Sequence, residues 1–304
     1  MTQDSTKILK SPEELKKLIF ENKFDKNLVY LAKAIKDRNA IKYDTVAVID
    51  GEEGGGKSTL AIILGYLTDE KFNLDKNIAY LPTTNEVEDK FTDLDSKQML
   101  IIDEAIKAFY KLRFMDKMQT RVNTMYATER KQRKNTLLCI PRFTDLNEFF
   151  RNDRVNFWIH VVSRGVAVVF VKDKLNLFGS DRWHMAEEYK RIMSTTFKTR
   201  FCDITPEDAL KIYQKSKLFW FSFAFPQLPE EVEDEYLRLR EEYNLLPAAK
   251  TLESDERKRH VLNLIKLNKE RNLGLMQKDI ASMAGMSEGS LSVFITKYVT
   301  PFEK

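Results

Sequence analysis

Two spacings of apolar residues alternate along the chain and predict strands and helices in turn. Short β-branched and apolar runs typical of buried strands are followed by stretches with apolar residues three or four positions apart, typical of helices. The expected strands are residues 45–50, 78–82, 99–104, 136–140, 155–162 and 166–171. Strands that alternate with helices predict an α/β fold with a mainly parallel sheet covered on both faces.

A glycine-rich loop, Gly51 to Ser58, joins the first strand to an apolar helix and fits G-x-x-x-x-G-K-[ST] at every fixed position. Its glycines let successive backbone N–H groups face one anion, and the helix start adds partial positive charge. We expect ATP phosphates here, with Lys57 at the β- and γ-phosphates and Ser58 on Mg²⁺. The expected nucleotide-binding residues are Gly51, Glu53, Gly54, Gly55, Gly56, Lys57, Ser58, Thr59 and Asp103.

Two acids, Asp103 and Glu104, end the strand 99–104 and give the Walker B pattern. Asp103 is expected to hold Mg²⁺ together with Ser58, and Glu104 to orient or deprotonate a water that attacks the γ-phosphate. With Lys57, Glu104 is therefore a candidate catalytic residue. The glutamate favours an ATPase that turns over rather than a kinase that must exclude water. The alternative is that acids at a strand end simply begin a helix.

Four parts are expected along the chain: an N-terminal helical segment (1–41), the ATPase domain (42–200), a helical connector (201–252) and a C-terminal module (253–304). Within the connector, Phe219, Phe221, Phe223 and Phe225 alternate, and in a strand they would share one face, where core packing is favoured over a subunit contact.

The C-terminal module contains a segment, residues 276–295, that resembles a helix-turn-helix, with Gly285 at the turn. Its second helix would offer Ser290, Ser292 and Lys297 to a DNA major groove. Such modules also bind protein, so a protein partner is the alternative.

Composition excludes several classes of protein. Two cysteines and three scattered histidines support neither a disulfide framework nor a metal cluster. The N-terminus does not resemble a signal peptide, and no apolar run approaches the roughly 20 residues of a membrane helix. We therefore expect a soluble, cytoplasmic protein (in the host cytoplasm if the chain is viral) with no membrane partner.

The net charge of +4 is small, but its distribution is uneven. Residues 104–154 hold 12 Lys and Arg against 6 Asp and Glu, which predicts a basic surface next to the ATP site, suited to nucleic acid. The candidates for DNA contact are Arg130, Lys131, Arg133 and Lys134. A solvated helix face is the alternative.

Together with these motifs, residues 42–172 resemble the FtsK/HerA branch of P-loop ATPases. The more specific part is residues 151–161, which is similar to the arginine-containing segment that leads into the strand beyond the sensor strand. The resemblance implies a RecA-like sheet, double-stranded DNA as partner and a homo-oligomeric ring such as a hexamer. It also implies Arg154, or with less support Arg151, as an arginine finger acting across the ring. A surface ion pair is the alternative for Arg154.

One departure concerns the fourth strand, which ends in Ile140-Pro141 where these ATPases usually carry a polar sensor. Arg142 or Thr144 would then contact the γ-phosphate in place of that sensor.

The leading interpretation is an ATP-hydrolysing DNA motor that acts in viral genome packaging or DNA transfer. One alternative is a nucleotide-gated DNA-binding regulator or replication factor. Another is a terminase-like ATPase subunit without a nuclease, since no acidic triad follows residue 173.

Overall fold

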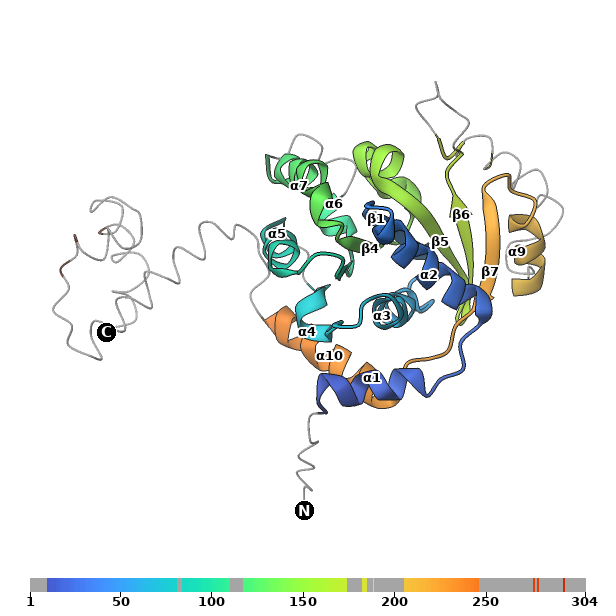
Figure 1. Ribbon diagram of the computed structural model, residues 1–304, viewed down its shortest axis with the longest axis horizontal. Helices are drawn as coiled ribbons and strands as arrows, with labels where there is room; N and C mark the ends of the chain where they lie inside the picture. The colour runs from blue at the N-terminus through green and yellow to red at the C-terminus, as the bar shows by residue number, and fades with distance from the viewer. Residues whose placement is uncertain are drawn as a thin grey trace, which may run out of the picture. The chain divides into compact units, whose positions relative to one another are not determined.

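The computed structural model describes residues 10–80, 84–109, 117–173, 182–184, 188, 205–245, 276, 278 and 292. The chain divides into two units, Met1–Leu246 and Pro247–Lys304. The first unit carries the sheet and the helices labelled in Figure 1. The helix-turn-helix expected in the second unit lies almost entirely outside the described residues.

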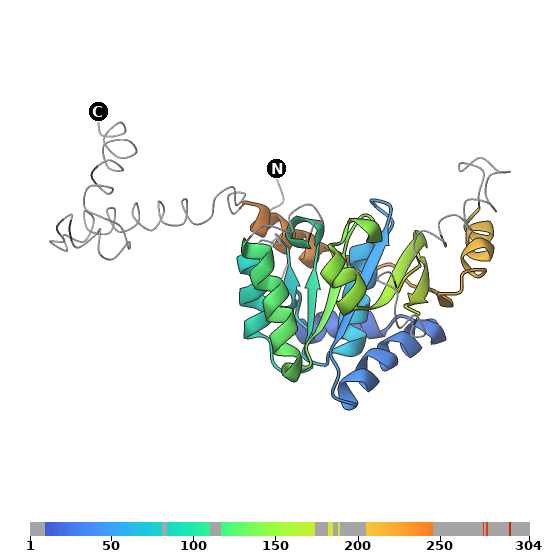
Figure 2. The same ribbon diagram turned by 90° about the horizontal axis from the view of Figure 1, so that it is seen from above.

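One seven-stranded sheet forms the centre of the first unit, in the order β2-β3-β4-β1-β5-β6-β7. Figure 2 shows the strands side by side. The first five strands in this order are parallel, and β6 and β7 are added antiparallel. The strand bounds are β1 (Thr45–Gly51), β2 (Ile78–Ala79), β3 (Met99–Ile102), β4 (Asn135–Cys139), β5 (Val155–Ser163), β6 (Val166–Val171) and β7 (Phe219–Ala224).

This topology confirms the expected RecA-like, mainly parallel α/β fold. Strand β4 lies between the phosphate-loop strand β1 and the Walker B strand β3, so the carboxyl ends of all three strands meet at one edge of the sheet. Loops at that edge are where open α/β sheets place their ligands.

Helices cover both faces of the sheet. They are α1 (Pro12–Phe20), α2 (Lys26–Ala40), α3 (Lys57–Thr68), α4 (Leu74–Asn77), α5 (Thr84–Asp93), α6 (Ile106–Phe109), α7 (Lys117–Thr128), α9 (Pro206–Tyr213) and α10 (Glu230–Leu245). Buried residues of α1 to α4 and α10 share one core cluster with one face of the sheet. Those of α5, α6 and α7 share a second cluster with the other face.

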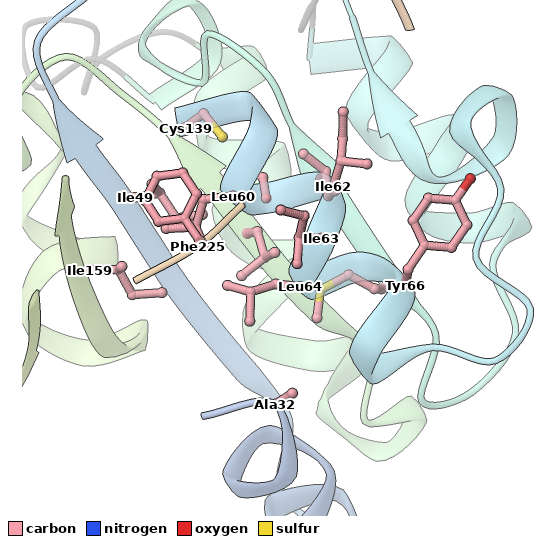
Figure 3. Close-up of a cluster of buried hydrophobic side chains, with 14 of the residues drawn as sticks. Ala32, Ile49, Leu60, Ile62, Ile63, Leu64, Tyr66, Cys139, Ile159 and Phe225 are labelled. Atoms are coloured by element: carbon pink, nitrogen blue, oxygen red, sulfur yellow. The ribbon is translucent and has the colours of Figure 1, made fainter. Parts of the chain in front are cut away.

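Helix α3 is the most deeply buried helix of the first cluster. Every residue from Leu60 to Tyr66 is buried, because the helix lies between the sheet and the helices outside it. Figure 3 shows Leu60 of α3 near Ile49 of β1 and Phe225, with which it shares the cluster. This packing fixes the start of α3, where the phosphate loop ends.

The expected helical connector, residues 201–252, contains a strand of the sheet. Phe219–Ala224 is the edge strand β7, and α10 packs into the sheet's own core. The expected N-terminal helical segment is present as α1 and α2, which pack in the same core through residues such as Leu15 and Leu28. Sequence spacing could not reveal these long-range contacts.

The alternating phenylalanines behave as expected for core packing, with one exception. Phe221, Phe223 and Phe225 pack in the first cluster, whereas Phe219 packs against the second. A register shift between Val169 and Phe170 on β6 accounts for the change of face.

No helix within the described part of the chain is long and apolar enough to cross a lipid bilayer.

Candidate nucleotide-binding site

The phosphate loop leaves β1 along a path that requires glycine. A Cβ on Gly51 would lie 2.7 Å from the carbonyl oxygen of Val161, a neighbour on β5. Gly54 and Gly56 have φ of 76° and 96°, in the left-handed region that side chains disfavour. The loop and the start of α3 therefore have the strand–loop–helix form expected of a phosphate cradle.

The ammonium group of Lys57 folds back over this loop. Its Nζ donates to the carbonyl oxygens of Gly51 at 2.9 Å and Glu52 at 2.7 Å. Both acceptors belong to the loop itself, so the positive charge already lies where phosphate oxygens are expected. Phosphate oxygens are stronger acceptors of such charge-assisted bonds than neutral carbonyls.

The two Walker motifs meet through one hydrogen bond. The Ser58 hydroxyl donates to Asp103 Oδ1 at 2.9 Å, and Asp103 is buried. A hydroxyl and a carboxylate are hard oxygen ligands of the kind Mg²⁺ prefers, so these residues fit the expected metal.

Glu104 follows Asp103 with a left-handed φ of 49°, which is uncommon for a residue with a side chain. Strained backbone of this type is concentrated at functional sites. Of the other expected nucleotide-binding residues, Glu53 is exposed and Thr59 is half-buried in the first turn of α3.

Helix α10 contributes two residues that sequence reasoning missed. The Tyr236 hydroxyl donates to Asp103 Oδ2 at 2.5 Å, and the Arg240 guanidinium donates to Glu104 Oε1 at 2.7 Å. Burial first, and then the Asp103 carboxylate, raise the pKa of Tyr236, so its hydroxyl stays a donor. The sequence carries only a weak signal, namely that these residues lie four apart on a charged helix.

A second network, also missed, fixes the start of the loop. Buried Asp50 accepts from Trp158 Nε1 at 2.7 Å, from the His160 ring at 2.9 Å and from the Phe143 backbone N–H at 2.9 Å. These bonds tie β1 to β5 and to the segment after β4. Nothing in the local sequence distinguishes Asp50 from an ordinary strand-end acid.

A cleft of about 330 Å³ opens beside the loop, a size typical of the smaller ligand pockets. Its lining residues are Glu52, Glu53, Gly54, Gly55, Val161, Val162, Ser163 and Arg164.

Arg142 and Thr144, the expected substitutes for the sensor, are exposed and follow the carboxyl end of β4. The preceding residue, Pro141, accepts a bond from Gly51 N at 3.4 Å, which brings this segment to the loop. A γ-phosphate contact by either side chain remains a prediction.

Arg154 lies at the opposite, amino edge of the sheet, just before β5. It is 5% exposed, and its guanidinium is paired with the Asp44 carboxylate. A finger must reach a neighbour's ATP across the molecular surface, so burial favours an ion pair for Arg154, although a buried pair rather than the surface pair named as the alternative. Arg151, the second candidate, is half-buried at the same edge. The role in trans stays a prediction for both.

The basic run also lies at the amino edge, before β4, rather than next to the phosphate loop as expected. Arg130 and Lys131 are exposed, while half-buried Arg133 donates to the Asn39 carbonyl at 3.3 Å.

The expectation for Lys134 is wrong. This residue is 3% exposed, its ammonium donates to the carbonyl oxygens of Phe91 and Thr92, and it lies over the Phe91 ring. Its charge is therefore used inside the fold.

In the C-terminal module, Ser292 is exposed, whereas Ser290 and Lys297 lie outside the described residues.

Comparison with known proteins gives distant structural likenesses alone. No protein-family model matches the chain, and no curated protein matches it. The N-terminal domain of zonular occludens toxin from Neisseria meningitidis is 14% identical with a TM-score of 0.34, and the match covers 63% of this chain and 98% of that one.

The RuvB Holliday junction branch migration motor of Thermotoga maritima is 13% identical over 90% of this chain and 88% of its own, with a TM-score of 0.33. A DNA polymerase III gamma subunit-related protein from the same organism is 11% identical over 89% and 96%, also with a TM-score of 0.33. Likenesses this distant assign no function to the chain.

Proposed function

We propose that the chain hydrolyses ATP and couples hydrolysis to movement of double-stranded DNA, as a motor of the FtsK/HerA type in viral genome packaging or DNA transfer. The observation that carries the hydrolytic part is the 2.9 Å bond from Ser58 to Asp103, which joins the two Walker motifs at the carboxyl edge of the sheet. Glu104 then stands next to the residues that would hold Mg²⁺ and the phosphates.

Each residue of this site has a distinct task. The loop N–H groups and Lys57 would bind and orient the phosphates. Ser58 and Asp103 would hold Mg²⁺, which would supply positive charge to offset the negative charge of the reacting phosphates. Glu104 orients the attacking water and accepts its proton. Phosphoryl transfer depends almost entirely on such positioning and electrostatic stabilisation, so no further nucleophile is needed.

The DNA-moving part rests on the resemblance of residues 42–172 and on surface charge. Exposed Arg130 and Lys131 are suited to phosphate contacts. In a ring of identical subunits around DNA, each subunit would contribute one such pair of basic residues to the surface that contacts the DNA. The second unit, Pro247–Lys304, would recruit the motor to DNA or to a protein partner.

The deciding experiment measures the ATPase rate with and without long double-stranded DNA, together with the mass of the assembly with and without ATP. We expect DNA to stimulate turnover and ATP to favour a ring. The matched control is Lys57→Ala, which removes the charge that bridges the phosphates and should abolish hydrolysis and weaken nucleotide binding.

Each contrary result selects an alternative. Slow turnover, no stimulation and site-specific DNA binding would identify a nucleotide-gated regulator or replication factor. DNA-stimulated turnover by a subunit that works only with a separate nuclease would identify a terminase-like ATPase. Turnover in Lys57→Ala equal to that of the wild type would reject the nucleotide site itself.

A further inference from the structure

One face of α10 occupies both acids of the Walker B pair. Tyr236 donates to Asp103 across 133 residues of sequence, and Arg240 donates to Glu104 across 136. The two residues are one helical turn apart, so they project from the same side of the helix. The same helix thus contacts the acid expected to hold the metal and the acid expected to act on water.

The helix carrying these side chains is firmly placed. Val232, Tyr236 and Leu239 are buried in the first core cluster. Tyr80 stacks on Tyr243 at 5.2 Å and lies 5.7 Å from Tyr236, measured between ring centroids. Figure 1 shows α10 beside α1, and Lys10, just before α1, forms an ion pair with Glu231 of α10 at 2.8 Å. Hence Tyr236 meets Asp103 from a fixed position.

Arg240 is held differently. Its side chain is 36% exposed and that of Glu104 is 41% exposed, so the pair lies at the solvent boundary. An ion pair in such a setting is weak, and it can open and close without moving the helix. While it is closed, Glu104 Oε1 accepts from Arg240 and the carboxylate faces α10.

We propose that α10 is a built-in brake on the ATPase site, in which Arg240 holds Glu104 away from the attacking water and Tyr236 competes with the metal for Asp103. This regulation rests on the proposed hydrolysis of ATP. Hydrolysis requires Arg240 to release Glu104, and metal binding requires Tyr236 to give up part of its bond to Asp103.

The test uses full-length variants. Arg240→Ala removes the guanidinium that bonds Glu104, Arg240→Lys keeps a positive charge near it, and Tyr236→Phe removes one hydroxyl while leaving the buried ring. The matched control is Arg238→Ala, on the same helix, since Arg238 pairs with Glu235 and Glu242 and touches neither Walker acid. Thermal melting confirms that each variant is folded.

Two readouts are needed. The first is kcat at saturating Mg²⁺ and ATP without DNA. The kcat of Arg240→Ala should be about two- to fivefold higher than that of the wild type, as expected for loss of a half-exposed ion pair. Arg240→Lys should stay nearer to the wild type, and Arg238→Ala should match it. The second is Mg²⁺-dependent binding of a non-hydrolysable ATP analogue by calorimetry, which Tyr236→Phe should tighten about tenfold. Analogue binding in EDTA should not change.

A change in the direction opposite to the expected one, in either kcat or Mg²⁺-dependent binding, overturns the proposal. A fall in kcat for Arg240→Ala would make Arg240 a residue that turnover needs, and weaker Mg²⁺-dependent binding by Tyr236→Phe would make Tyr236 a support for Asp103. Equal kcat values for Arg240→Ala and wild type reject the brake alone. An absence of turnover in every variant rejects both the brake and the proposed hydrolysis. Neither readout involves DNA, so failure of the DNA motor leaves them intact.

Discussion

Two arginine–carboxylate pairs lie at opposite edges of one sheet and differ mainly in burial. At the carboxyl edge, Arg240 and Glu104 are 36% and 41% exposed. At the amino edge, Arg154 and Asp44 are 5% and 18% exposed. Breaking an exposed pair costs about 0–1 kcal/mol, whereas leaving one buried charge unpaired costs about 3–5 kcal/mol. The same chemistry is therefore suited to switching at one edge and to fixing structure at the other.

Glu104→Gln gives the largest expected effect and tests the functional side of this comparison. The amide is nearly isosteric but cannot accept a proton from water, so kcat should fall by about 10²- to 10⁴-fold while ATP still binds. Single-turnover hydrolysis and analogue binding measure the two effects separately. The counterpart at the amino edge, Asp44→Asn, should keep kcat. A fall of less than about tenfold in Glu104→Gln would exclude Glu104 as the catalytic base.

Arg154→Ala tests the structural side. It leaves Asp44 without its partner, so the free energy of unfolding should fall by about 3 kcal/mol, while kcat of the folded protein stays near the wild-type value. Denaturant unfolding of Arg154→Ala, Asp44→Asn and the double variant should show strong non-additivity, as expected for residues in direct contact.

An arginine finger predicts a different pattern for the same variant. Turnover would drop by about 10³- to 10⁵-fold with ATP binding intact. Mixing with Lys57→Ala subunits would then restore activity at interfaces that pair an intact site with an intact finger. Such rescue would contradict the purely structural role, and its absence in demonstrably exchanging subunits would turn attention to Arg151 and Arg142.

Local sequence predicted the parts of the site that are contiguous in the chain. The phosphate loop needs Gly54 and Gly56 for their left-handed backbone, and the Walker B acids follow an apolar strand, so each motif carries its own physical reason. The alternation of strands and helices also predicted the mainly parallel sheet.

Contacts between distant segments could not be predicted in the same way. Tyr236 and Arg240 reach the Walker acids only because α10 packs onto the sheet's core. Lys134 looked like part of a charge run, yet the fold buries it over Phe91. Both outcomes depend on tertiary packing, which spacing along one segment does not contain.

Deleting residues 253–304 removes most of the second unit. Its effect on the ATPase should be smaller than the effects of the substitutions above. The first unit ends at Leu246, so its basal turnover should remain. DNA affinity or partner recruitment should weaken by at least about tenfold, the value of one good base contact. The deleted module carries 9 Lys and Arg against 7 Asp and Glu, so groove contacts rather than bulk charge should dominate. Unchanged DNA affinity and unchanged partner binding would rule out this role.

The smallest expected effect concerns the exposed and buried cations of the amino edge. Substituting Arg130 and Lys131 by Gln should weaken DNA binding evenly across sequences, and the salt dependence of the binding constant should fall by about one unit per lost phosphate contact. Lys134→Gln should instead lower stability, because its ammonium is bonded to buried carbonyl oxygens. Lys71→Gln is the control for the DNA-binding measurements, because Lys71 is exposed, pairs with Asp95 at 3.4 Å and lies outside the basic run. Anisotropy titrations over a range of salt would measure each slope. Equal slopes for Arg130→Gln, Lys131→Gln and Lys71→Gln would mean that the basic run is only a solvated surface, and that any DNA contact lies elsewhere on the chain.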